Sequence, residues 1–130
     1  MHPLRRAAET EAIDEVQALL AENVVFVSPV AFSPYTGRDM VSAILRGVYG
    51  VFEDFRYEKE LGHPNGRDYA LIFKARVGDR EIHGCDLVHH DENGLIDEFT
   101  VMVRPLSAVN ALASAMRPKF ALIEREAGIA

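Results

Sequence analysis

Apolar residues follow two different spacings along this chain. In residues 4–22 and 38–51 they recur every three or four positions, which is typical of amphipathic helices. After residue 53 apolar and polar residues alternate, which is typical of strands with one buried face. The pattern therefore predicts helices in the first part of the chain and a sheet in the second.

The first helical segment contains a break near Glu9–Glu11, and Asn23 is expected to close it. The run NVVFVS then predicts a strand that stops at Pro29. The stretch PVAFSPYTG, which is rich in turn residues, predicts a loop that leads into the second helix.

Four strands are predicted after the second helix, and Gly78-Asp79 joins the middle two in a type II′ turn. Pro105 ends the sheet, SAVNALASAM predicts a helix, and Pro118 is expected to kink or end it. The predicted strands cover residues 54–61, 69–77, 80–90 and 95–104. Without repeats or linkers, this order predicts one α+β domain over residues 1–130, with 105–130 as a C-terminal helical extension.

The two-residue turn also fixes which side chains share a face of the hairpin. Val77 is expected to lie opposite Arg80, and Leu71 opposite Asp86. One face then carries Leu71, Phe73, Ala75, Ile82, Gly84, Asp86 and Val88. The other face carries Lys74, Arg76, Glu81, His83, Cys85 and His89, with a cross-strand ion pair expected between Arg76 and Glu81.

Asp86 is therefore a carboxylate on an otherwise apolar face, and Gly84 is expected to leave free space beside it. Burial disfavours the charged form, so the pKa of Asp86 is expected to rise. Such a carboxyl can donate a hydrogen bond or act as a general base near pH 7. The alternative is a carboxyl that a backbone amide or a nearby tyrosine satisfies, with a role in the fold only.

Composition narrows the class of partner. Acidic residues outnumber Lys and Arg by 20 to 14, and the basic residues are scattered, which argues against nucleic acid. No apolar run approaches the ~20 residues of a membrane span, and the first residues lack the apolar region of a signal peptide. The single cysteine, Cys85, cannot form an internal disulfide. We expect a cytoplasmic protein.

The order of elements, together with VVFVSPVAFSPYTGRDMV and VMVRPLSAVNALASAM, resembles the SnoaL-like group of the nuclear-transport-factor-2-like superfamily over residues 10–117. The resemblance implies a cystatin-like conical α+β barrel. Helices pack there on a curved, mainly antiparallel sheet that encloses an apolar cavity. It also implies a small apolar ligand, no cofactor, and a homodimer through the outer face of the sheet.

GCDLVHHDENGLI resembles the strand-turn-strand of ketosteroid isomerase, a member of the same superfamily. The matching aspartate of that enzyme stays protonated and donates a hydrogen bond to the substrate oxyanion, and Asp86 stands at its place. Two parts differ: Ser28 occupies the place of the general base, and no tyrosine precedes Tyr35 to match the oxyanion tyrosine of the first helix. The isomerase set is incomplete.

Other members of the superfamily use different sets. A SnoaL-like cyclase needs an aspartate as acid and base in the cavity, which Asp86 can provide. An epoxide hydrolase of the limonene type needs an Asp-Arg-Asp set around one water. Asp86 and Asp97 are the candidate carboxylates for it, but Arg76 is expected to face away.

Further side chains are candidates for the cavity, although simple packing is the alternative for each. Polar anchors at its mouth are Ser28, Tyr35, Tyr49 and Tyr57. The apolar wall is expected to hold Phe52, Leu71, Phe73, Gly84, Val88, Phe99, Val101 and Val103.

No metal site is expected. His83 and His89 share a face, but six residues of strand separate them by about 20 Å, and His90 points the other way. These histidines suit a pH-sensitive dimer contact. Cys85 is expected to be a small core or interface residue, and DENG to be a turn without the ligands of a calcium loop.

Two functional hypotheses follow. In the first, the protein has no assigned activity and binds a small hydrophobic molecule in its cavity. In the second, it is a cyclase- or isomerase-type enzyme that uses Asp86 as acid and base on a small carbonyl compound.

Overall fold

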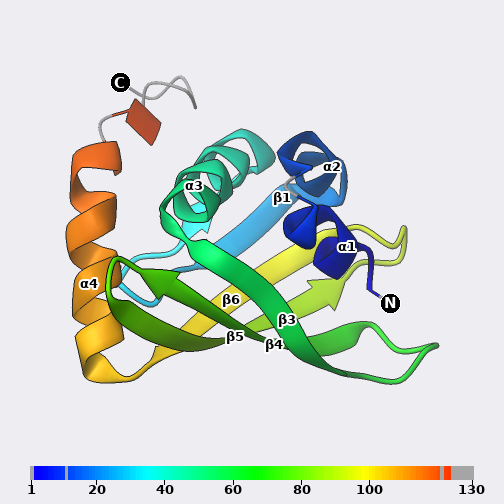
Figure 1. Ribbon diagram of the computed structural model, residues 1–130. Coiled ribbons are helices and arrows are strands. Elements are labelled where there is room, and N and C mark those ends of the chain that lie inside the picture. The colour runs from blue at the N-terminus through cyan, green and yellow to red at the C-terminus, as the bar shows by residue number, and fades with distance from the viewer. Residues whose placement is uncertain (1, 11, 121, 124–130) are drawn as a thin grey trace.

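The computed structural model describes residues 2–10, 12–120 and 122–123 (Figure 1). Two helices, α1 (Pro3–Glu9) and α2 (Ile13–Ala18), are followed by two strands, β1 (Leu20–Val27) and β2 (Tyr35–Thr36), and then by helix α3 (Arg38–Val51). The rest of the sheet is β3 (Glu53–Leu61), β4 (Asp68–Val77), β5 (Arg80–His90) and β6 (Ile96–Arg104). Helix α4 (Leu106–Met116) and a 3₁₀ turn, Arg117–Lys119, follow.

The strands form one mixed sheet in the order β2-β1-β6-β5-β4-β3. Only the β1–β6 pair is parallel among the described strands. The sheet curves, and α1, α2 and α3 lie over one of its faces while α4 stands across one end beside α3 (Figure 1). The α+β class and the helix-covered, curved sheet are confirmed.

The first helical segment differs from its prediction. The expected break is present, but α2 ends at Ala18 and β1 already begins at Leu20, so Asn23 lies inside a strand and closes no helix. The reason is tertiary: Leu20 pairs with Ile96 of β6 and is fully buried. Adjacent apolar residues such as Leu19 and Leu20 fit either spacing, so the pattern alone could not place this boundary.

The β4–β5 hairpin has the predicted register. Val77 pairs with Arg80, and Leu71 pairs with Asp86. Gly78 has φ +61°, the left-handed conformation that the first position of a type II′ turn requires. All seven residues predicted for the inner face of this hairpin are buried.

The predicted ion pair between Arg76 and Glu81 is wrong. Arg76 instead contacts Glu53 at 3.1 Å and Asp54 at 2.8 Å, both on β3. Arg76 lies on β4, between β3 and β5, and Glu53 is its register partner on β3. A hairpin considered alone could not reveal this competing neighbour.

The C-terminal helix follows the sheet as predicted, and it ends at Met116, two residues before Pro118. The part of the expected extension at residues 124–130 lies outside the described residues. Among the described helices, none is long and apolar enough to cross a membrane.

Candidate functional site

A cavity lies between the inner face of the sheet, α3 and α4. Its walls are apolar except for a few side chains, and among the described lining residues Asp86 alone carries a carboxyl group. The free volume is about 30 Å³, enough for one or two water molecules. The lining consists of Phe26, Ser28, Pro29, Val30, Tyr35, Ile44, Leu45, Val48, Tyr49, Phe52, Phe55, Phe73, Asp86, Phe99, Val101, Leu112, Met116 and Phe120.

Asp86 is held by one tyrosine. The hydroxyl of Tyr57 donates a hydrogen bond of 2.5 Å to Oδ2 of Asp86, and both residues are only 3% exposed. Between the described residues, this is the one hydrogen bond found for the Asp86 carboxyl. The second carboxyl oxygen therefore remains available to a molecule in the cavity.

The surroundings of Asp86 favour its protonated form. Burial raises its pKa from 3.8 to about 7, and the hydrogen bond from Tyr57 opposes this rise. The hydroxyl of Tyr57 lies close to the hydroxyl of Tyr49 as well as to the carboxyl of Asp86. Burial and the nearby Asp86 raise the pKa of Tyr57 and of Tyr49 well above its ordinary value. Both tyrosines therefore remain hydrogen-bond donors at neutral pH.

Three strands place this polar group. Asp86 takes the inner side of β5 by the alternation of that strand, and β4 separates it from Tyr57 on β3. Tyr57 pairs with Phe73 of β4, and its ring meets the rings of Phe55 and Phe73 edge-on. Aromatic packing thus fixes the direction of the Tyr57 side chain.

Gly84 has a different role from the one predicted. A Cβ atom at Gly84 would lie 2.2 Å from Cζ of Phe73, its register partner on β4. The space beside Asp86 is therefore filled by the Phe73 ring, and Gly84 does not line the cavity. The prediction of free space is wrong because it considered one strand without the side chain opposite.

The structure brings together part of the predicted site. Those of its members that line the cavity are Ser28, Tyr35, Tyr49, Phe52, Phe73, Asp86, Phe99 and Val101. Tyr57 reaches the cavity group through Asp86, whereas Leu71, Val88 and Val103 lie elsewhere on the inner face and are not among the lining residues. Their roles in ligand binding remain predictions.

Sequence reasoning missed the helical side of the cavity. The residues concerned are Ile44, Leu45 and Val48 of α3, Leu112 and Met116 of α4, and Phe120. The apolar stripe of α3 was the available signal, but only packing shows that it faces a cavity.

Among the predicted polar anchors, the Ser28 hydroxyl accepts a hydrogen bond of 3.1 Å from the amide of Val30, so it serves the turn after β1.

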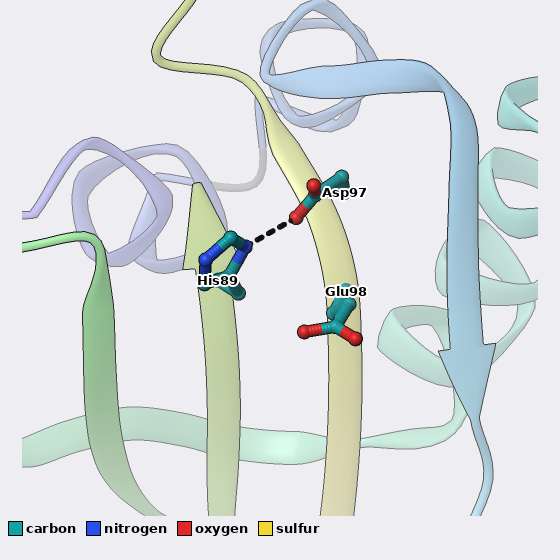
Figure 2. Close-up of side chains that lie close together, drawn as sticks. All are labelled: His89, Asp97 and Glu98. Carbon is teal, nitrogen blue, oxygen red and sulfur yellow. Dashed lines mark hydrogen bonds and ion pairs between the residues drawn. The ribbon is translucent and has the colours of Figure 1, made fainter. Parts of the chain in front are cut away.

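The outer face carries a separate polar group, drawn in Figure 2. His89 Nδ1 lies 2.7 Å from Asp97 Oδ1, and Glu98 lies beside them. The register between β5 and β6 shifts here, so Asp97 and Glu98 both come near His89. The hydrogen bond to Asp97 is the main cause that raises the pKa of His89.

Each of these three residues offers one atom that could bind a metal ion, and the three atoms all lie within 4.8 Å of one another. The histidines considered from the sequence were His83, His89 and His90, and Asp97 and Glu98 were missed because the bulge between β5 and β6 was not foreseen. An ordinary ion pair accounts for the contact between His89 and Asp97. We therefore keep the prediction that the protein has no metal site.

Cys85 is partly buried, as expected for a small packing residue. Burial, and secondly the nearby Asp86, raises the pKa of its thiol. The thiolate is therefore disfavoured, which argues against a nucleophilic role for Cys85.

Comparison with known proteins places this geometry in context. A family model described as a SnoaL-like domain matches residues 4–99. No curated protein matches the chain. Among solved structures, an uncharacterized protein with a cystatin-like fold from Silicibacter pomeroyi DSS-3 is 35% identical with a TM-score of 0.88, over 98% of this chain and 91% of that one.

A structure named a steroid delta-isomerase, from Pseudomonas aeruginosa, is 38% identical with a TM-score of 0.80, over 94% of this chain and 95% of that one. An epoxide hydrolase of the LEH-like type from M. tuberculosis is 17% identical with a TM-score of 0.62, over 92% and 90% of the two chains, which shows a shared fold alone.

Proposed function

The chain belongs to the SnoaL-like family, and from that premise we propose that its cavity binds a small, largely apolar molecule that carries a carbonyl oxygen. The observation that supports this most directly is that Asp86, buried and hydrogen-bonded to Tyr57, stands in the wall of an apolar cavity. Buried polar groups that converge in an apolar pocket fix the orientation of a ligand.

The protonated form of Asp86 is suited to bind the carbonyl oxygen of a ligand. Below its pKa of about 7 the carboxyl is neutral, and its O–H can donate a hydrogen bond to a carbonyl oxygen. Tyr49, which is half-buried and lines the cavity, offers a second donor nearby. The apolar walls then accept the hydrocarbon part of the ligand.

The size of the cavity adds a condition. A free volume of about 30 Å³ does not hold a ring of six carbon atoms, so binding has to displace side chains of the lining. The segment Ser28–Val30 belongs to the lining and lies outside the regular helices and strands, and Phe120, another lining residue, directly follows the 3₁₀ turn Arg117–Lys119. We expect these residues to move when a ligand enters.

The test is a thermal-shift comparison of matched ligands, cyclohexanone against methylcyclohexane, at pH 6. We expect the ketone to raise the melting temperature more, because only the ketone accepts a hydrogen bond from protonated Asp86. Asp86→Leu should abolish the advantage of the ketone. The matched control is Glu81→Gln, an exposed acid on the same strand, which should preserve it. Equal effects of the two ligands on the native protein would refute the proposal.

A second candidate function is proton transfer on such a ketone, with Asp86 as acid and base. A pKa of about 7 is near the optimum for this role at neutral pH, and the relative from Pseudomonas aeruginosa that is 38% identical is named a steroid delta-isomerase. Asp86 would take a proton from the carbon beside the carbonyl, giving an enolate, and return a proton to the same carbon.

In D₂O this exchange raises the mass of the ketone by one for each proton replaced, so mass spectrometry can follow it without a known substrate. Exchange that is unchanged in Asp86→Asn would exclude Asp86 as the base. Exchange at the rate of buffer alone would leave binding as the proposed function.

We also propose that two copies pair through the outer face of the sheet. Four basic residues lie opposite one another across β3 to β6 at one end of this face, namely Arg56, Lys74, His83 and Arg104. Asp68, Asp97 and Glu98 surround His89 at the other end. A twofold axis across the strands would place the basic row of each copy over the acidic end of the other.

A further inference from the structure

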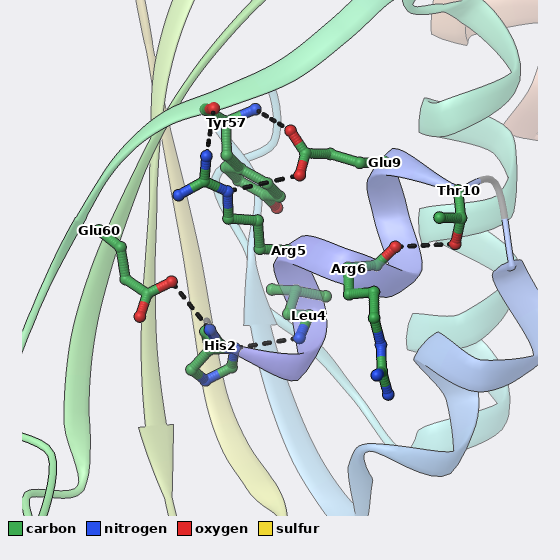
Figure 3. Close-up of polar contacts among 8 residues, drawn as sticks. All are labelled: His2, Leu4, Arg5, Arg6, Glu9, Thr10, Tyr57 and Glu60. Carbon is green, nitrogen blue, oxygen red and sulfur yellow. Dashed lines mark hydrogen bonds and ion pairs between the residues drawn. The ribbon is translucent and has the colours of Figure 1, made fainter.

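Helix α1 is attached to β3 at the residue that holds Asp86. Arg5 Nη2 donates a hydrogen bond of 3.2 Å to the carbonyl oxygen of Tyr57, and the amide of Tyr57 donates one of 3.1 Å to Glu9 Oε2 (Figure 3). Arg5 and Glu9 also contact each other at 3.4 Å. Both backbone groups of Tyr57 are thus bound by two side chains from one helix.

Tyr57 needs such partners because of its place in the sheet. β3 is an edge strand, so the backbone groups on its outer edge have no strand to pair with. The register between β3 and β4 also shifts between Tyr57 and Lys59, which weakens the local pairing. Arg5 and Glu9 supply the hydrogen bonds that a neighbouring strand would otherwise provide.

α1 itself is firmly seated, so it can transmit this restraint. Leu4, Ala7 and Ala8 are buried beneath it. His2 accepts a hydrogen bond from the amide of Leu4, and its own amide donates one of 2.8 Å to Glu60, three residues beyond Tyr57 on β3. The helix is therefore fixed along the edge of β3 at two points.

We propose that Arg5 and Glu9 are positioning residues, which hold the Tyr57 backbone so that its hydroxyl stays on Asp86. This inference rests on the proposed function for its biological meaning, since it assigns to α1 the control of the group that meets the ligand. Neither residue is among those that line the cavity. They act through Tyr57, and their effect is on the proton affinity of Asp86.

The experiment is the titration of the Asp86 carboxyl by ¹³C NMR in Arg5→Ala, Glu9→Ala and Tyr57→Phe, with no ligand present. The hydrogen bond from Tyr57 lowers the pKa of Asp86, so its loss should raise that pKa. We expect Tyr57→Phe to raise the proton affinity about tenfold, and each α1 variant to raise it roughly three- to tenfold.

The sign separates positioning from a direct effect of charge. Removing the negative charge of Glu9 would by itself lower the pKa of Asp86, and removing the positive charge of Arg5 would raise it. Loss of positioning predicts a rise in both variants. Glu9→Gln, which removes the charge but keeps an acceptor for the Tyr57 amide, should not raise the pKa of Asp86.

The matched control is Arg6→Ala, an exposed arginine on the same helix, which should leave the titration unchanged. If Arg5→Ala or Glu9→Ala does not fold, Arg5→Lys, which keeps the charge but not the geometry of the guanidinium, should still give a smaller rise. Lower melting temperatures with an unmoved Asp86 titration would overturn the proposal. Because the titration uses no ligand, its result does not depend on whether the ketone binds, and the two proposals can fail separately.

Discussion

On β5 the inward-facing residues Gly84, Asp86 and Val88 are buried, whereas Leu87 is exposed and Cys85 only half-buried on the opposite side. The two faces belong to the same strands, but the inner face is buried in the protein and the outer face is exposed to water. The inner face holds the carboxyl of Asp86, with a pKa raised to about 7 by burial. The outer face holds His89, whose pKa is raised chiefly by its hydrogen bond to Asp97.

This contrast separates two physical effects. On the inner face, loss of water destabilises the charged form of Asp86, so neutralisation of the group is favourable. On the outer face, water remains close, and opposite charges stabilise the charged form of His89 at little cost in desolvation. Acidic and basic groups are therefore shifted in the same direction for different reasons.

The largest expected effect is the dependence of stability on pH that Asp86 causes. Its raised pKa destabilises the fold once pH exceeds 3.8, the pKa of the carboxyl in the unfolded chain, and the cost grows until pH reaches about 7. The full difference corresponds to roughly 4 kcal/mol. Asp86→Asn should therefore stabilise the protein more at pH 8 than at pH 4, as measured by urea unfolding. A large loss of stability at both pH values would show that the carboxyl serves the fold.

Gly84→Ala is expected to cost about 3 kcal/mol, because the new methyl group would overlap the ring of Phe73. Cys85→Ala, the neighbouring change on the outer face, should cost less than half as much. Chemical unfolding of both variants measures the difference. Similar losses for the two would mean that the inner face is packed more loosely than its distances indicate.

On the outer face, the pair of His89 with Asp97 should give a pH dependence of opposite sign. The raised pKa of His89 contributes stability that is full below 6.5 and is lost as pH rises through the raised value. The melting temperature should therefore fall as pH rises above 6.5. Asp97→Asn should remove this fall, whereas Asp91→Asn is not expected to alter it. A fall that persists in Asp97→Asn would assign it to other groups.

The smallest effect on stability is expected at the basic row. Lys74→Glu should change the unfolding free energy of one copy by less than about 0.5 kcal/mol, since its contact with Glu58 is exposed. The same change should weaken self-association, measured by sedimentation at low salt. Lys74→Glu with Glu98→Lys in the same chain should restore it. A native protein that sediments as a monomer would refute pairing through this face.

The alternation of residues was sufficient to place Asp86. The turn at Gly78-Asp79 has two residues and admits one register, so Asp86 fell on the inner face before any tertiary information was used. The helix Arg38–Val51 was also predicted to the residue, since its apolar stripe and flanking turn residues agree. In both cases the determining contacts are local in the chain.

The partners of these residues depended on segments far apart in the sequence. Tyr57 on β3 reaches Asp86 on β5 across β4. Likewise, Arg76 pairs with β3 and not with the strand of its own hairpin. Each result depends on which strand lies next to which, and local periodicity contains no such information.

By itself, then, the sequence determined the class of fold, the order of its longer helices and strands, and the side of the sheet on which each residue of the hairpin lies, because spacing and turn geometry are properties of neighbouring residues. Only the tertiary structure decided that Asp86 meets Tyr57, that α1 binds the backbone of Tyr57, and that a bulge brings Asp97 to His89. Those contacts arise when distant segments pack together and exclude water, and hydrogen bonds then form between the polar groups that remain.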